Sequence, residues 1–215
     1  MAQGYAVLWP RIPYDPRTEG DPVDLWPLEV LAAIEAAVRQ GFTDPDRPAA
    51  MGESFRGLAV LQLLSRTARF RCAVVDSAIA DVGAYFGDMA QALDHPERGG
   101  HGVVAWCEIG QGGMGAPPWE RPERYVAHSP VYALDRIHTP LLLLAGDREA
   151  AVPWTQSAAV YVGLNRLRRT RELSVYRGEG HTVPGWGEAN RRDAVGRILG
   201  WLATHVGAGV APARM

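Results

Sequence analysis

The chain has 215 residues, of which 47% are hydrophobic and 21% are charged, and its formal net charge is −2. This composition supplies one sizeable core and favours a single globular domain over two. The near-neutral charge provides no general electrostatic basis for binding nucleic acid or an anionic membrane surface. We interpret the densest basic run, residues 166–171 (RLRRTR), as a solvated helix end and turn.

The cysteines, the histidines and the N-terminal sequence argue against further classes of protein: disulfide-rich, metal-binding and secreted. Cys72 and Cys107 are too few for a disulfide framework, and no pair of histidines has metal-ligand spacing, so no metal is expected. The N-terminal stretch lacks a basic segment and is interrupted by Pro10 and Pro13, unlike a signal peptide. All apolar runs are shorter than the roughly 20 residues of a membrane span. The sequence thus predicts a soluble, cytoplasmic protein and leaves its oligomeric state open.

Strand-like and helix-like segments alternate along the chain. In the first half the pattern predicts a strand at 5–9, a helix at 25–38, a helix at 58–70, a strand at 72–75 and a helix at 79–89. In the second half it predicts a strand at 140–145, a helix at 153–167, a strand at 172–176 and a helix at 191–205. Such alternation is typical of an α/β protein whose mostly parallel sheet has helices on both faces.

Residues 93–130 interrupt this alternation. They are rich in Gly, Pro and His and lack clear periodicity, which predicts a lid-like excursion over the top of the sheet. We expect one α/β domain over residues 1–206, followed by a flexible tail at 207–215.

The stretch MGESFRG, residues 51–57, is similar to a nucleophile elbow, Gly-x-Ser-x-Gly, in which a sharp turn between strand and helix exposes a serine. Gly52 and Ser54 fit this pattern, and the N–H of Phe55 would donate to an oxyanion. Arg56 stands where the last glycine belongs and is expected to crowd the corner, which Gly57 would partly relieve. The alternative interpretation of this motif alone is an ordinary serine that caps a helix.

Two later loops contain the other groups that such a serine needs. Asp147 and Glu149 follow the apolar strand at 140–145, and His181 follows the strand that ends at residue 176. Functional groups gather at the carboxyl ends of strands in open α/β sheets. The chain order of serine, acid and histidine is the order of α/β-hydrolases. In that scheme His181 takes the proton of Ser54, and the acid orients the imidazole.

Several longer motifs resemble one family. They are GYAVLWP at 4–10, FTDPDR at 42–47, GESFRG at 52–57, FRCAVVDSAIAD at 70–81, WERPERYVAHSP at 119–130, IHTPLLLLAGD at 137–147, VPWTQS at 152–157, YRGEGH at 176–181 and EANRRDA at 188–194. Together they make the chain similar, from Gly4 to about His205, to the catalytic domain of the prolyl oligopeptidase family of serine peptidases. The resemblance implies an α/β-hydrolase fold.

The resemblance also implies roles for individual residues. It makes Ser54 the nucleophile and His181 the general base. The family's acid is normally an Asp three residues after a strand-closing glycine. Counting from Gly146 gives Glu149, a longer carboxylate, and Asp147 is the alternative.

Two further expectations follow from the family. Tyr85 and Phe86 lie in the segment that helps to shape the substrate pocket of relatives, with plain packing under the lid as the alternative. Relatives begin this domain with earlier strands and a His-Gly-Gly-type loop that helps to complete the oxyanion hole. Because this chain opens on the strand after that loop, we expect an N-terminally truncated version of the fold.

Two functions from different classes follow. The first is a serine-type peptidase that cleaves short peptides through an acyl-enzyme at Ser54, without a cofactor. An esterase on the same site is a close variant, because a fold does not determine its substrate. The second is a truncated or degenerate homologue that does not catalyse and acts as a binding module. Arg56, the low strand propensity of residues 48–50 and the expected lack of the first strands motivate this second function.

Overall fold

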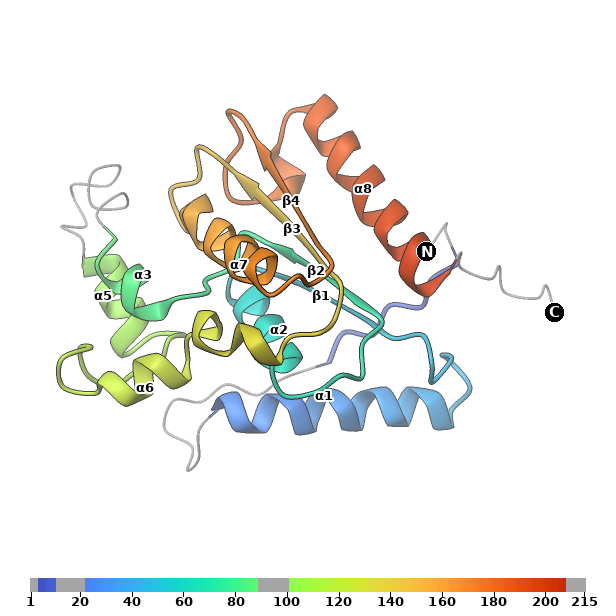
Figure 1. Ribbon diagram of the computed structural model, residues 1–215, viewed down its shortest axis with the longest axis horizontal. Coiled ribbons are helices and arrows are strands. Elements are labelled where there is room, and N and C mark those ends of the chain that lie inside the picture. Colours follow the sequence, from blue (N-terminus) through green and yellow to red (C-terminus); the bar gives the residue numbers. More distant parts are fainter. Residues whose placement is uncertain (1–3, 11–21, 89–100, 208–215) are drawn as a thin grey trace.

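A four-stranded parallel sheet with the order β1-β2-β3-β4 forms the centre of the molecule (Figure 1). The computed structural model describes residues 4–10, 22–88 and 101–207. The strands are β1 (Ala49–Glu53), β2 (Cys72–Asp76), β3 (Leu141–Gly146) and β4 (Arg171–Tyr176). The helices within these residues are α1 (Pro22–Arg39), α2 (Phe55–Leu64), α3 (Val82–Phe86), α5 (His101–Glu108), α6 (Pro122–Ala127), α7 (Trp154–Arg166) and α8 (Glu188–Val206), with 3₁₀ turns η2 (Pro130–Arg136) and η3 (Val183–Gly185).

Helices cover both faces of the sheet, as the alternating pattern predicts. Successive side chains of a strand point to opposite faces, so each strand contributes to two cores. On β2, Ala73 and Val75 pack in the cluster that includes side chains of α1, α2 and α7. Cys72 and Val74 belong to the opposite cluster with α8. Figure 1 shows α8 on one side of the sheet and α2 and α7 on the other.

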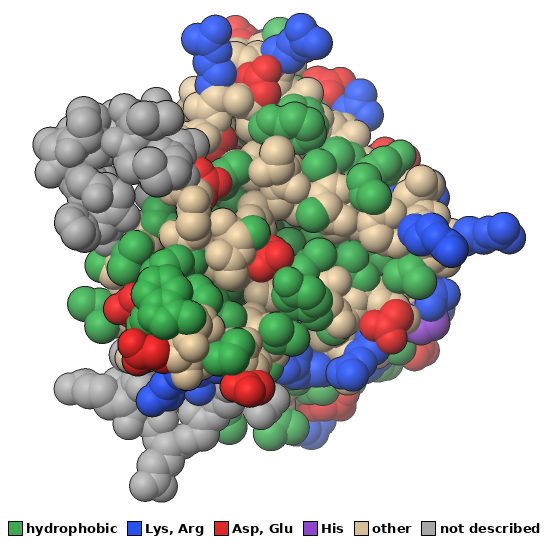
Figure 2. All heavy atoms as spheres, turned by 60° about the vertical axis from the view of Figure 1, so that its left-hand side comes forward, with side chains coloured by type: hydrophobic (Ala, Val, Ile, Leu, Met, Phe, Trp, Pro, Cys, Tyr) green, Lys and Arg blue, Asp and Glu red, His purple; other side chains and the backbone are tan. Residues whose placement is uncertain are grey.

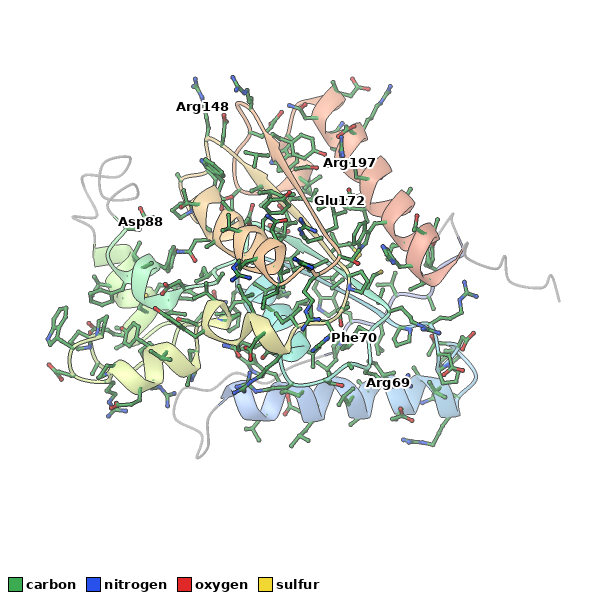
Figure 3. The ribbon with its side chains drawn as sticks, viewed as in Figure 1. Arg69, Phe70, Asp88, Arg148, Glu172 and Arg197 are labelled. Atoms are coloured by element: carbon green, nitrogen blue, oxygen red, sulfur yellow. The ribbon has the colours of Figure 1, made fainter. Side chains whose placement is uncertain are left out.

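Parallel pairing brings the carboxyl ends of all four strands to one edge. Glu53 pairs with Asp76, and Asp76 pairs with Leu144. Figure 3 places Arg148, in the loop after β3, at this end of the sheet, and Arg69 and Phe70, which precede β2, at the opposite end. The loops after β1, β3 and β4, which contain the predicted catalytic residues, therefore share one end of the molecule.

A third apolar cluster lies beside these carboxyl ends and joins α3, α5 and α6. It contains Leu58, Ile79, Val82, Tyr85, Val103, Cys107, Met114, Tyr125 and Val152. Helices α5 and α6 fall in the stretch 93–130, where the sequence has no clear periodicity. Both are short, with eight and six residues, so neither completes enough turns to display a helical repeat. Residues 89–100 and 208–215 lie outside the described chain, and with them part of the expected excursion and most of the tail.

Three sequence-based predictions need correction. The strand predicted at 5–9 is absent, and Val7 and Trp9 are 70% and 73% exposed. An apolar sequence does not suffice for a strand, because its backbone groups also need a neighbouring strand to pair with. The helix predicted at 58–70 is α2, which begins directly after Ser54 and ends at Leu64. The helix predicted at 79–89 shortens to α3, because the Asp81 side chain accepts from Ala84 N and starts the helix there. In the described ranges no helix is long and apolar enough to cross a membrane.

Candidate active site

Ser54 occupies the turn between β1 and α2. Its backbone has φ 57° and ψ −124°, an unusual conformation for a residue with a side chain. The Ser54 N–H donates to the carbonyl oxygen of Asp76 on β2 at 2.9 Å, which fixes the turn to the neighbouring strand. Because Phe55 is the first residue of α2, its N–H belongs to the helical turn whose donors face the N-terminus of that helix. The sequence predicts this strand–serine–helix geometry.

The crowded glycines of the turn are Gly52 and Gly57. A Cβ on Gly52 would lie 2.3 Å from the carbonyl oxygen of Arg56, and one on Gly57 would lie 2.5 Å from the Cβ of Ala78. Arg56 is instead exposed, with its guanidinium 5.0 Å from the ring centroid of Trp9. The crowding expected at Arg56 is therefore wrong. Position 56 faces outward at the start of α2, and the close contact with Ala78 falls one residue later, at Gly57.

Gly57→Ala is expected to lower the free energy of unfolding by about 1–3 kcal/mol, the cost of overpacking a well-packed site. The new Cβ would meet Ala78 and Val75, neither of which has a long side chain that can swing away. Arg56→Ala is the control on the adjacent residue, and we expect it to cost at most the about 0.5–1 kcal/mol of an exposed cation–π contact. Urea unfolding measures both; equal losses would contradict this assignment of the crowded position.

Glu149 and His181 meet above the ends of β3 and β4. His181 Nδ1 is bonded to Glu149 Oε1, which also accepts from Val152 N at 2.8 Å. The Glu149 side chain is 1% exposed and that of His181 is 26% exposed. The hydrogen bond with Glu149 raises the pKa of His181, and burial opposes this. With Nδ1 held by the carboxylate, Nε2 is the nitrogen left for proton transfer.

Asp147, the alternative acid, has another partner. Its Oδ1 accepts from Gly178 N at 2.6 Å, and its own N–H donates to the carbonyl oxygen of Tyr176 at 3.0 Å. A third bond joins the N–H of Arg148 to the carbonyl oxygen of Glu179 at 3.0 Å. These three bonds tie the loop after β3 to the loop after β4. Asp147 thus braces the two loops, and Glu149 is the carboxylate that contacts the imidazole.

Gly146 allows these loops to pass closely, because a Cβ there would lie 2.2 Å from the carbonyl oxygen of Glu179. The loop of His181 is held from the other side by Trp186, whose indole N–H donates to the carbonyl oxygen of Gly180 at 2.8 Å.

Within the described residues no hydrogen bond joins Ser54 to His181. Catalytic hydrogen bonds are often long without substrate and tighten when it binds.

Aromatic side chains form a wall next to Ser54. Phe55 packs edge-to-face on Trp106 at 6.1 Å between ring centroids, and Tyr85 packs on the same indole at 5.3 Å. The Tyr85 hydroxyl donates to the carbonyl oxygen of Ala151 at 2.9 Å, which ties α3 to the loop of Glu149. Phe86 is half-buried and packs on Trp119 and Tyr125 instead. Of the two predicted pocket residues, Tyr85 is therefore part of this wall, where its side chain is buried, and Phe86 packs on other aromatic rings.

Sequence reasoning missed two residues of this region, Trp106 and Asp76. Trp106 lies on α5, in the stretch without periodicity, and no local motif marks it. Asp76 lies within the motif FRCAVVDSAIAD, and a charged residue directly after the apolar run CAVV, at a strand's carboxyl end, is a signal that could have found it. No three His, Cys, Asp or Glu side chains of the described chain are grouped so that they could hold a metal ion.

The family follows from comparison with known proteins. The model of the prolyl oligopeptidase family matches residues 28–209, well over half of the chain. The chain belongs to the prolyl oligopeptidase family. This confirms the resemblance based on the sequence motifs.

Two proteins of similar sequence that are named as peptidases agree with this assignment. An uncharacterized peptidase, YuxL, of Bacillus subtilis is 23% identical over 83% of this chain and 25% of its own length. Dipeptidyl-peptidase 5 of Porphyromonas endodontalis is 25% identical over 72% of this chain and 21% of its own length. The chain thus spans about a quarter of the length of these relatives.

Solved structures confirm the α/β-hydrolase fold of this family. A puromycin-hydrolyzing peptidase of Mycobacterium tuberculosis has a TM-score of 0.67 and 24% identity, with 85% of this chain and 25% of that chain covered. An acylaminoacyl peptidase of Pyrococcus horikoshii has a TM-score of 0.66 and 16% identity, with 88% of this chain and 29% of that chain covered. At these identities the likeness establishes the fold and leaves the chemistry to the site.

Proposed function

We propose that this chain is the catalytic part of a serine-type peptidase that uses Ser54, His181 and Glu149 and forms an acyl-enzyme. The observation on which the proposal rests is the bonded His181–Glu149 pair at the same end of the sheet as the strained turn of Ser54. A positive φ in a serine costs free energy, and such strain is concentrated at functional sites. Membership of a peptidase family supports the same reaction.

The first half-reaction transfers the acyl group to the protein. Ser54 Oγ attacks the carbonyl carbon of the substrate while its proton moves to Nε2 of His181. The Phe55 N–H donates to the resulting oxyanion, and Glu149 stabilises the imidazolium. The bond from carbon to the leaving nitrogen breaks as His181 returns the proton to that nitrogen. Water then attacks the acyl-enzyme by the same route and releases the acid.

The surface near the site favours an apolar or uncharged acyl group. Phe55, Tyr85 and Trp106 form an aromatic wall at Ser54. Figure 2 shows that hydrophobic side chains gather over the middle of this face, with single acidic side chains among them and arginines mostly toward its margins. A substrate with a hydrophobic side chain next to the scissile bond would bury apolar area against this wall. Short peptides and aryl esters of apolar acyl groups are the proposed substrates.

A second candidate is a homologue that binds peptides without cleaving them. The lack of a Ser54–His181 hydrogen bond in the described chain is the observation that favours it. On this proposal the wall of aromatic side chains would still bind an apolar ligand, but Ser54 would not become acylated.

A fluorophosphonate probe separates the two candidates, because it reacts only with an activated serine. The peptidase is expected to be labelled at Ser54, and Ser54→Ala is expected to abolish labelling. Ser65→Ala is the matched control at the other end of α2, where the hydroxyl donates to the carbonyl oxygen of Gln62 at 2.8 Å; it should be labelled normally. Labelling that is absent from the folded wild-type protein, or that persists in Ser54→Ala, would sink the proposal.

A further inference from the structure

Asp76 is a buried acidic residue between the strands that lead to Ser54 and to Glu149. It ends β2 and is 8% exposed. Its carbonyl oxygen accepts from Ser54 N, and the next residue, Ser77, donates its N–H to the carbonyl oxygen of Leu144 on β3 at 2.9 Å. The main chain at Asp76 is therefore fixed on both sides by the elements of the catalytic site.

Among the described residues, one hydrogen-bond donor contacts the side chain of Asp76. Its Oδ1 accepts from the hydroxyl of Ser77 at 3.1 Å. Ser77 has φ 47°, which resembles the strained turn of Ser54 on the neighbouring strand. A carboxyl group that is buried with this single neutral donor in the described chain is poorly solvated.

Charged groups face Asp76 from three elements. In the described chain these are Glu53 at the end of β1, Glu149 in the loop after β3 and His181 in the loop after β4. The pKa of Asp76 is raised to about 7: burial is the main cause, the Ser77 hydroxyl opposes it, the two glutamates add to it and His181 opposes it. In return, an ionised Asp76 adds to the effect of Glu149 in raising the pKa of His181. Asp76 and His181 thus each affect the pKa of the other.

We propose that Asp76 is a positioning residue of this site: a buried carboxyl beside the Glu149–His181 pair that balances the charge of the imidazolium. It touches neither the substrate nor the reacting atoms. When His181 accepts the proton of Ser54, the field of the Asp76 carboxylate favours the charged ring in a region of low dielectric. The inference builds on the proposed reaction and assigns to it a residue that no part of the triad scheme requires.

NMR titration of the His181 imidazole tests the proposal without any need for catalysis. In the wild-type protein the ring signal is expected to show, besides the titration of His181 itself, a second step near pH 7 where Asp76 ionises, because the two groups are coupled. In Asp76→Asn it should titrate in one step with a lower midpoint. Asp147→Asn, which removes a nearby exposed carboxylate, should retain the wild-type curve.

The wild-type curve decides the question even if Asp76→Asn does not fold, because a single step there overturns the proposal. An unchanged curve in a folded Asp76→Asn protein also overturns it and leaves Asp76 a purely structural residue. Failure of the probe to label Ser54, with the two-step curve intact, would instead refute the proposed peptidase function alone. The two inferences therefore fail independently.

With a hydrolysed substrate, kcat/KM supplies a second readout. In Asp76→Asn the acid limb of the pH profile should move to lower pH, because His181 loses its proton more easily. The plateau should fall about 3- to 10-fold, since the imidazolium is less stabilised in the transition state. Asp76→Glu should recover part of both effects. An unshifted acid limb would overturn the proposal.

Discussion

His181→Ala is expected to lower kcat/KM for an aryl ester or peptide anilide by about 10⁴- to 10⁶-fold, the range found when a triad base is removed. Without the imidazole the proton of Ser54 has no acceptor, and the hydroxyl is a weak nucleophile. His138→Ala is the matched control. It removes an exposed histidine just before the amino-terminal end of β3, at the opposite end of the strand from Glu149, and should leave the rate unchanged.

Non-additivity makes this test specific to a working triad. Ser54→Ala, His181→Ala and the double variant are expected to fall to the same residual rate, since each removes the same concerted step. Steady-state kinetics on proteins with unchanged circular dichroism would measure this. If His181→Ala retained more than about a tenth of the activity, well above the residual rates of triad variants, His181 would not be the general base.

Glu149→Gln has the second largest expected effect, a fall in kcat of about 10³- to 10⁴-fold by analogy with the loss of a triad acid. The amide can no longer stabilise the imidazolium and can present its NH₂ to Nδ1, which selects the wrong tautomer. The same oxygen also accepts from Val152 N, so the substitution loosens the loop as well.

Asp147→Asn tests the choice between the two acids. The Asn oxygen can still accept from Gly178 N, so the brace between the loops survives and the rate should change by less than about 3-fold, the size of a surface substitution. Equal losses in Glu149→Gln and Asp147→Asn would contradict the assignment of Glu149. A large loss confined to Asp147→Asn would make Asp147 the acid.

Much of the fold is predictable from local patterns. The run LLLLA is so apolar that it must be buried on both faces, and β3 is that strand. The helical repeat at 25–38 corresponds to α1. Residues 5–9 are as apolar as a strand but form none. The difference is physical, since a helix satisfies its own backbone groups, whereas a strand needs a neighbour that the local sequence does not specify.

The candidate site likewise has features that the local sequence predicts and features that depend on the tertiary structure. The sequence alone determined the chain order of Ser54, the acidic loop and His181, and the turn that presents the serine, because these depend on short motifs next to strand ends. Only the tertiary structure decided that Glu149 rather than Asp147 contacts His181, because the bond of Asp147 to Gly178 exists only when β3 and β4 pair. It also placed Trp106 at the aromatic wall.

The turn at Ser54 depends on both the local sequence and the tertiary packing. The sequence pattern Gly-x-Ser before a helical segment predicts a strand-to-helix turn at Gly52 and Ser54, and the structure shows that turn, with Ser54 at φ 57°. The packing of α2 on β2 and on the segment that follows it decided that the second tight position is Gly57, so that Arg56 points to solvent and contacts Trp9. Burial at the end of β2 likewise raises the pKa of Asp76 to about 7, because side chains distant in sequence share a dielectric environment only after the strands have assembled.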